Sequence, residues 1–181
     1  MKRHKVAFTV VSKRKASGIY LPIQLTQTIN GFRIKPRNHR INNGYLDCRL
    51  AAAMVRWVEI LSAYGFTAVE YASIYRRNAR VGGSSKVSGH AHGLAVDIRS
   101  FTLGEHRIVD VKDDWIERER GGDPCAMQYD EPVPAQLMRR AVCEAGARKL
   151  FQVILTPHYD RAHADHIHLE VVPNVNWDYI R

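Results

Sequence analysis

The sequence predicts an α+β domain over residues 46–181, with an antiparallel central sheet carrying a metal site and helices packed on one side. Three observations lead to this class. Short runs with strand-type composition outnumber the amphipathic segments, of which residues 50–63 and 135–150 are the clearest. The last two strand-like runs are joined by a connection too short for a crossover helix, which favours antiparallel pairing. A chain of 181 residues is also long enough to bury a core.

Residues 1–45 have the composition of a small β-rich extension. Residues 6–11 and 20–26 are strand-like runs separated by a turn. Asn30-Gly31 lies between two further short runs, and both residues tolerate positive φ, which is typical of a tight hairpin. A polar, turn-rich stretch follows. It predicts a linker to the main domain.

The main domain begins with the clearest helix of the chain. Residues 50–63 have apolar side chains at helical spacing, Asp47 can cap the start, and Gly65 can end the helix. Further strands are expected at residues 66–74, 94–101, 107–111, 152–156 and 167–172, and further helices at 112–120 and 135–150.

The formal charge of +9 favours an anionic partner. The basic residues of the chain are scattered, and the sequence contains no basic helix with interleaved aromatics. We therefore do not expect nucleic acid as the partner. A polyanionic cell wall fits the charge equally well, as does a solvated basic face. No apolar run reaches the roughly 18 residues of a membrane span. We expect the protein to be a monomer.

The cysteines give a weaker indication. Cys48, Cys125 and Cys143 lack the CxxC spacing of metal ligands. A Cys125–Cys143 bridge is the first choice, and buried free thiols are the alternative. The basic start is not followed by a small-residue cleavage site, so either the protein is cytoplasmic or the sequence begins after an export signal.

Histidines and carboxylates concentrate in residues 88–98 and 163–168. A catalytic zinc keeps three protein ligands and one open position, and imidazole and carboxylate are suitable ligands. One histidine and Asp97 from the first segment, with one histidine from the second, would supply this set. In an extended chain His90 and Asp97 would lie more than about 20 Å apart, so the chain must fold back, and Gly93 permits this.

The second segment contains more candidates than one ion needs. His166 and His168 share one face of the expected strand, so one can ligate while the other contacts water or substrate. Asp165 can act as a general base only if that strand begins irregularly. His92 is expected to shape its loop rather than to ligate. The simplest interpretation of the remaining histidines is that they lie on the surface: His4, His39, His106 and His158.

The pattern Ser88-x-His90-x-x-Gly93-x-Ala95-x-Asp97, followed later by His168, resembles the superfamily that contains lysostaphin, D-alanyl-D-alanine metallopeptidases and the hedgehog signalling domain. Within it, the chain is most similar to the extensin-like C-terminal domain of bacteria. The similarity covers roughly residues 48–172. The first 45 residues lie outside it.

The resemblance implies a zinc metallopeptidase-like domain with named roles. Zn²⁺ ligation falls to His90, Asp97 and His168. The catalytic residues would be Asp165 as general base, with His166 as the rival, and His163 as an additional site histidine. We expect Arg76, which Arg77 could replace, and His163 to stabilise the developing oxyanion.

We therefore expect a zinc-dependent peptidase that hydrolyses an amide bond in peptidoglycan stem peptides or cross-links, in the periplasm or outside the cell. The alternative is a non-catalytic zinc-containing module that binds the cell wall or another partner. Hedgehog-type relatives imply that this scaffold can hold zinc without evident peptidase activity.

Overall fold

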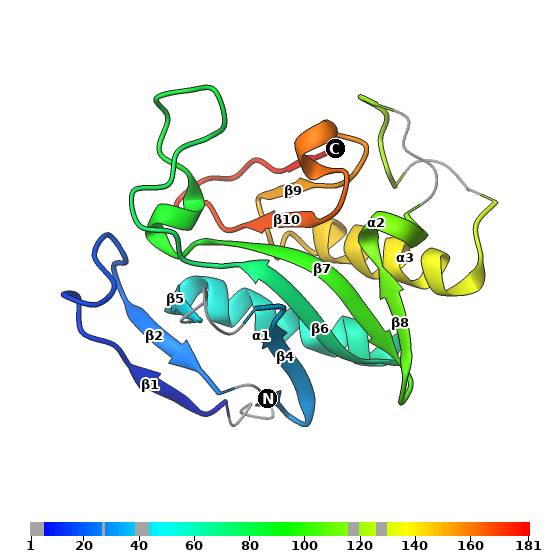
Figure 1. The fold of residues 1–181 in the computed structure, drawn as a ribbon, viewed down its shortest axis with the longest axis horizontal. Helices are drawn as coiled ribbons and strands as arrows, with labels where there is room; N and C mark the ends of the chain where they lie inside the picture. Colours follow the sequence, from blue (N-terminus) through cyan, green and yellow to red (C-terminus); the bar gives the residue numbers. More distant parts are fainter. Residues whose placement is uncertain (1–5, 27, 39–43, 116–119, 126–129) are drawn as a thin grey trace.

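In the computed structural model, residues 6–26, 28–38, 44–115, 120–125 and 130–181 can be described. They form a mixed α+β fold with two sheets (Figure 1). The smaller sheet has the order β1-β2-β5, with β1 at Phe8–Val10, β2 at Pro22–Leu25 and β5 at Tyr45–Asp47. The central sheet has the order β11-β9-β10-β7-β6-β4-β3, with β8 paired to β7. Its strands are β3 (Thr28–Ile29), β4 (Phe32–Pro36), β6 (Phe66–Ser73), β7 (Ala95–Leu103), β8 (Arg107–Asp110), β9 (Val153–Leu155), β10 (Ile167–Glu170) and β11 (Tyr179–Ile180).

The central sheet is mixed rather than wholly antiparallel. β6, β7, β8, β9 and β10 pair antiparallel, as expected. β4 pairs parallel with β6, and β11 pairs parallel with β9. The β4–β6 pair is parallel because the chain between them passes through β5 and a long helix, which returns it to the end from which it started.

The first 45 residues are divided between both sheets. The predicted hairpin turn is confirmed: Asn30 and Gly31 have φ of 52° and 85°, and they join β3 to β4. Because β4 pairs with β6, this hairpin belongs to the central sheet, while β1 and β2 pair with β5. A division into two domains at residue 45 stays a prediction.

Two helices cover one face of the central sheet (Figure 1). The first, α1, spans Cys48–Ala63, and the Asp47 side chain accepts a hydrogen bond from the Arg49 amide, as its capping role predicts. The second, α3, spans Val133–Ala147. Trp57 of α1 joins these layers, because its indole donates to the Ala141 carbonyl of α3 at 3.3 Å and its ring packs edge-on against Phe101 of β7.

The expected helix at 112–120 is reduced to one turn, α2, at Val111–Asp114, and residues 116–119 lie outside the described part. In the described part of the chain, no helix is both long enough and apolar enough to cross a membrane.

His158 corrects one expectation, because it is fully buried rather than on the surface. Its Nε2 lies 3.1 Å from the Arg139 guanidinium, which also forms a buried ion pair with Glu131 and stacks on Trp115 with its carbon 4.2 Å from the ring centroid. An imidazole can be buried when it accepts such a hydrogen bond. His106 is exposed as expected, whereas His4 and His39 lie outside the described residues.

The cysteine prediction is confirmed. Cys125 and Cys143 form a disulfide, which joins the segment before α3 to α3 itself. Cys48 is free and exposed, so the alternative of buried thiols does not hold for it.

Gly93 allows a stability test of the turn that leads into β7. Its φ is +61°, and a Cβ there would lie 2.7 Å from Ile19 Cδ1 and 3.0 Å from the Asp47 amide nitrogen. We expect Gly93→Ala to lower the free energy of unfolding by about 1–3 kcal/mol, measured by urea denaturation. Gly82→Ala is the matched control, since a Cβ there would meet no atom within 4 Å and the φ of Gly82 is not positive. Equal stability of the two variants would contradict the role of Gly93.

Candidate metal centre

Three elements bring the candidate ligands together. His90 lies on a short 3-10 helix, η1, at Gly89–His92, which Ser88 caps by accepting a hydrogen bond from the His90 amide. Gly93 ends η1 in the left-handed conformation and turns the chain into β7, which confirms the predicted fold-back. Asp97 on β7 is directly opposite His168 on β10 in the antiparallel register. Residues distant in sequence therefore meet at one point of the sheet.

One atom from each side chain points to a common centre. His90 Nε2 lies 3.0 Å from Asp97 Oδ1 and 3.3 Å from His168 Nδ1, and His168 Nδ1 lies 3.0 Å from Asp97 Oδ1. All three residues are buried, with 1%, 7% and 8% of the surfaces of His90, Asp97 and His168 exposed. They form the ligand group, a set of two imidazoles and one carboxylate that could hold a metal ion.

The spacing of these atoms fits a small cation. Bonds of about 2.0–2.1 Å at tetrahedral angles place neighbouring ligand atoms about 3.3 Å apart. The triangle of 3.0, 3.0 and 3.3 Å is close to that value. Two imidazole nitrogens and a carboxylate oxygen meeting without a cation or a shared proton would repel one another through their lone pairs.

A further hydrogen bond fixes the orientation of each ligand. His90 Nδ1 donates to the Ile74 carbonyl at 2.7 Å, which leaves the lone pair on Nε2. His168 Nε2 donates to Glu170 Oε2 at 3.1 Å and so directs Nδ1 to the centre. Ser73 Oγ donates to Asp97 Oδ2 at 2.7 Å, which leaves Oδ1 available. Such outer partners are the usual support of metal-binding histidines and carboxylates.

The charges of the ligand group are strongly coupled. Burial opposes ionisation of Asp97, but the hydrogen bond from His168 and the close contact with His90 outweigh it and hold the pKa of Asp97 well below its usual range. Burial also opposes protonation of His168, yet its hydrogen bonds to Asp97 and Glu170 raise the pKa of His168 to about 9. Without an ion, the shared proton on His168 Nδ1 therefore holds the three atoms together.

A second pair of residues lies beside the ligand group. β10 begins only at Ile167, so Asp165 lies in a turn, as its proposed role required. Both oxygens of its carboxylate have partners. One accepts a hydrogen bond from His166 Nδ1 at 2.8 Å, and the other forms an ion pair with Arg99. His166 Nε2 in turn lies 3.7 Å from Asp97 Oδ1. Burial raises the pKa of Asp165, but the bonds to His166 and Arg99 dominate and lower it.

His163 lies on the same side of the ligand group. Its ring centroid is 5.0 Å from that of His166 and 6.0 Å from that of His168. Nδ1 donates to Asp160 Oδ1 at 2.7 Å, so Nε2 is an acceptor in the neutral ring. Burial and the neighbouring histidines lower the pKa of His163, although its hydrogen bond to Asp160 opposes this shift. The lowered pKa favours the neutral form.

The other candidates lie around η1. Arg76 is exposed, and its backbone amide donates to the His90 carbonyl at 3.1 Å, so the chain at Arg76 is fixed beside the ligand turn. Arg77 is exposed next to it. His92 does not belong to the ligand group; its Nδ1 bonds to the Gly18 carbonyl at 2.8 Å and ties η1 to the β1–β2 connection.

Sequence reasoning gave no role to three residues of this site: Ser73 and Glu170, which bond to ligands, and Arg99, which bonds to Asp165. A signal for two of them was present. Glu170 follows His168 by two residues and Arg99 follows Asp97 by two, and alternate residues of a strand share a face. Glu170 also explains why residue 89 is a glycine. A Cβ on Gly89 would lie 2.5 Å from the carboxylate carbon of Glu170.

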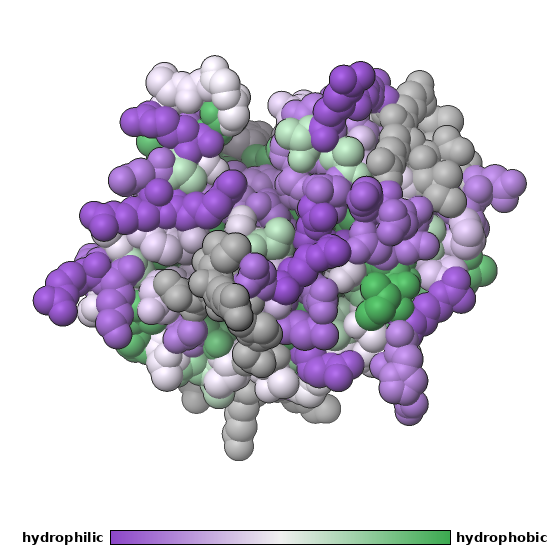
Figure 2. Space-filling view, in the orientation of Figure 1, coloured by the Kyte–Doolittle hydropathy of each residue, from purple (hydrophilic) through white to green (hydrophobic). Residues whose placement is uncertain are grey.

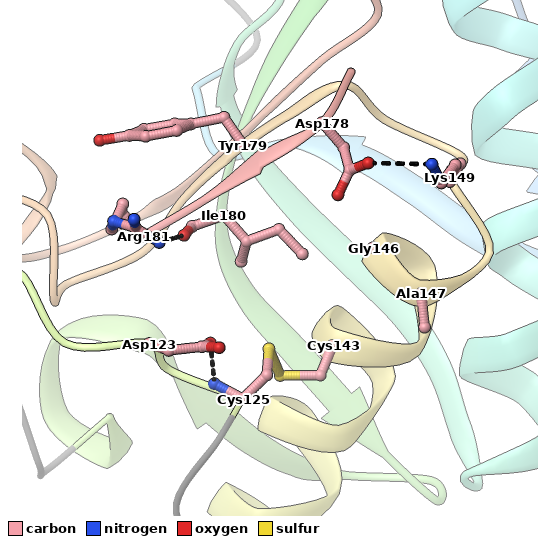
Figure 3. Close-up of a pocket in the computed structure, with 10 residues that line it drawn as sticks. All are labelled: Asp123, Cys125, Cys143, Gly146, Ala147, Lys149, Asp178, Tyr179, Ile180 and Arg181. Carbon is pink, nitrogen blue, oxygen red and sulfur yellow. Dashed lines mark hydrogen bonds and ion pairs between the residues drawn. A yellow bond between two sulfur atoms is a disulfide. The ribbon is translucent and has the colours of Figure 1, made fainter. Parts of the chain in front are cut away.

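A separate pocket of about 380 Å³ lies between α3, β11 and the segment around Asp123 (Figure 3). The Cys125–Cys143 disulfide and the Lys149–Asp178 ion pair, at 3.2 Å, lie on its walls (Figure 3). The ligand group and its neighbours do not contribute to its lining. The candidate chemistry therefore belongs to the metal centre and not to this pocket.

Ion binding at this centre should release a proton. Because the pKa of His168 is raised to about 9, its Nδ1 carries a proton at pH 7 that a metal ion must displace. We expect about one proton released per ion at pH 7, and an apparent affinity that rises about tenfold per pH unit until about pH 9. Calorimetry in buffers of different ionisation enthalpy measures this release. Binding without proton release at pH 7 would contradict the assignment.

Glu170 offers a test of the outer hydrogen bonds. In Glu170→Gln the charge that supports the His168 Nε2 proton is lost while the size of the side chain is kept. We expect the affinity for Zn²⁺ to fall about 10-fold or more, measured by competition with a chromogenic chelator. Glu105→Gln, at a side chain that is 91% exposed, is the matched control and should bind as the wild type does.

Comparison with known proteins gives one match. A search of curated proteins and a search of solved structures each find no significant match. The family model described as extensin-like protein C-terminus matches residues 2–181. The match includes the first 45 residues, which the sequence resemblance had left out. By this coverage the chain belongs to the extensin-like protein C-terminus family.

Proposed function

We propose that this protein is a zinc-dependent peptidase that hydrolyses an amide bond in peptidoglycan stem peptides or cross-links. The observation that carries the proposal is the Asp165–His166 pair, whose free nitrogen, His166 Nε2, lies 3.7 Å from a ligand oxygen of the metal centre. A purely structural ion would not need an oriented base beside it.

The donor set and the disulfide support zinc as the ion. Two imidazoles and a carboxylate with an open position suit catalytic zinc, although mononuclear non-haem iron uses the same set. The Cys125–Cys143 disulfide favours an oxidising compartment, such as the periplasm or the cell exterior. A redox-inert ion suits such a compartment better than ferrous iron does.

His166 is the better candidate for the general base. When bound, zinc supplies a Lewis acid that lowers the pKa of water and polarises the scissile carbonyl. Asp165 accepts a hydrogen bond from His166 Nδ1–H, which leaves the lone pair on Nε2. His166 Nε2 can therefore take the proton of the attacking water and return it to the leaving amine. The lowered pKa of Asp165 makes its carboxylate a weak base. Asp165 then acts by orienting His166.

Arg76 is the better candidate to stabilise charge on the carbonyl oxygen. A guanidinium always carries a positive charge and donates hydrogen bonds, and Arg76 is fixed at the His90 turn. His163 in its neutral form offers Nε2 as an acceptor, so it suits an N–H group of the substrate rather than an oxyanion. Arg77 remains the substitute for Arg76.

The proposed substrate rests on the motif and the charge. The Ser88-to-Asp97 pattern with His168 supports a place in the superfamily that contains lysostaphin and D-alanyl-D-alanine metallopeptidases. Peptidoglycan carries free carboxylates on its stem peptides, which fit a chain of formal charge +9.

The test is digestion of purified sacculi, with the products identified by mass and the metal content measured. We expect His168→Ala to lose both zinc and hydrolysis. We expect His166→Gln and Asp165→Asn to retain zinc but lose about 10²-fold or more in kcat, with the larger loss at His166. His106→Gln, at an exposed histidine, is the matched control.

Two outcomes would reject the proposal. If His166→Gln and Asp165→Asn both hydrolyse as the wild type does, the pair has no catalytic role. If zinc-loaded wild type binds sacculi but releases no fragment, the protein is a non-catalytic wall-binding module that contains zinc.

A further inference from the structure

Two loops next to the metal centre carry a concentration of positive charge. One joins β1 to β2 over residues 11–21, and the other joins β6 to η1 over residues 74–88. Neither segment contains an Asp or a Glu. Together they supply seven positive charges, against a formal excess of nine for the whole chain. We name these seven exposed residues the basic rim: Lys13, Arg14, Lys15, Arg76, Arg77, Arg80 and Lys86.

Both loops are fixed to the turn that carries His90. Tyr75 donates its hydroxyl hydrogen to the Ser17 carbonyl at 2.7 Å, which joins one loop to the other. The Gly18 carbonyl accepts from His92 at 2.8 Å, and a Cβ on Gly18 would lie 2.8 Å from the Ala91 carbonyl oxygen. The first loop therefore packs against η1 without space for a side chain.

The second loop is also held by backbone contacts of its own. An isolated β-bridge joins Arg80 to Val87 within it, and the Ser88 amide donates to the Ala79 carbonyl at 3.0 Å. A small core of Val11, Ala16 and Ile19 holds the first loop in place, with Tyr75 of the second packed against it. The basic rim is thus carried on a folded scaffold that includes the ligand turn.

Like charges carried on a fixed scaffold raise the local positive potential, which attracts an anionic partner. Figure 1 shows both loops at the same end of the molecule, on either side of η1. In the same view, strongly hydrophilic side chains lie at this end as they do over the rest of this face (Figure 2). The surface is hollowed between the projecting 74–88 loop and the η2 turn at Arg161–His163 (Figure 2).

We propose that the basic rim is a binding surface for the free carboxylates of peptidoglycan stem peptides, and that it positions the polymer along the metal centre. This proposal rests on the proposed function for the identity of the polymer. It assigns a role to the β1–β2 connection, which supplies three of the seven cations. Removal of the rim charges other than Arg76 and Arg77 should weaken binding of the polymer and leave the chemistry at the ligand group intact.

The observations favour the wall polymer over nucleic acid. The cations lie on two loops rather than on a basic helix of the kind that enters a nucleic-acid groove. They also adjoin a centre whose ligand set suits hydrolysis, in a protein with a disulfide. Duplex DNA therefore serves as the competing probe in the test.

The test compares two variants that each lose four charges. The rim variant is Lys13→Gln, Arg14→Gln, Lys15→Gln and Lys86→Gln, which leaves Arg76 and Arg77 in place. The matched control carries Arg33→Gln, Arg56→Gln, Arg107→Gln and Arg140→Gln, at exposed positions on other elements. Both are made in the His168→Ala background, and binding to purified sacculi is measured by co-sedimentation from 50 to 300 mM NaCl.

We expect the rim variant to bind roughly fivefold or more weakly than the control at 50 mM NaCl, with the difference shrinking at 300 mM because salt screens exposed charges. Sacculi whose carboxyl groups have been amidated should bind both variants equally weakly. Thermal unfolding of both variants checks that the fold is retained. With the ligand group intact, the rim variant should keep its kcat on a small soluble muropeptide while KM on sacculi rises.

Equal binding of both folded variants to sacculi would overturn the rim proposal even if the wild type hydrolyses them. Tighter binding of the wild type to duplex DNA than to sacculi, lost in the rim variant, would overturn the choice of polymer. Rim-dependent binding by a wild type that never hydrolyses sacculi would support the rim and reject the peptidase. The binding assay uses His168→Ala, so the two proposals fail independently.

Discussion

The structure depends on the close approach of three polar atoms that cannot be stable neighbours on their own. His90 Nε2, Asp97 Oδ1 and His168 Nδ1 meet within 3.0–3.3 Å in a buried position. Hydrogen bonds on the far side of each ligand determine which atom points inward. A cation, or the proton that takes its place on His168, is required to make this arrangement favourable. β7, β10 and η1 hold the three atoms in this arrangement.

Two structural features bring the atoms together. The β7–β10 register places Asp97 opposite His168, and η1 returns the chain so that His90 reaches the same point. The smaller sheet supports the turn, because the Asp47 amide donates to the Gly93 carbonyl at 2.9 Å. Asp47 also accepts from the Leu21 amide at 3.1 Å and pairs with Arg49. The first part of the chain therefore belongs structurally to the metal centre.

Local signals in the sequence were sufficient for the parts of the site and fold that depend on neighbouring residues. Asn30-Gly31 predicted the hairpin because positive φ is a local requirement, and Gly93 predicted the fold-back between His90 and Asp97 for the same reason. The histidine and aspartate spacing, with the resemblance to known metallopeptidases, indicated the ligand group that the structure brings together.

Features that depend on distant partners were not predictable in this way. The parallel β4–β6 pair requires knowledge of where the chain returns after α1. His158 is expected at the surface until Arg139 and Trp115 are seen around it. The contacts of the Asp165 carboxylate also needed the structure, because its partner Arg99 is distant in sequence.

The distance in sequence between the ligands has a consequence for biogenesis. His168 follows His90 by 78 residues, and its strand comes after α3 and β9 in the chain. A growing chain that has emerged only through β8 offers His90 and Asp97 but no third ligand. An ion held by all three ligands could therefore be captured only after β10 has been made, and it would link β7 to β10.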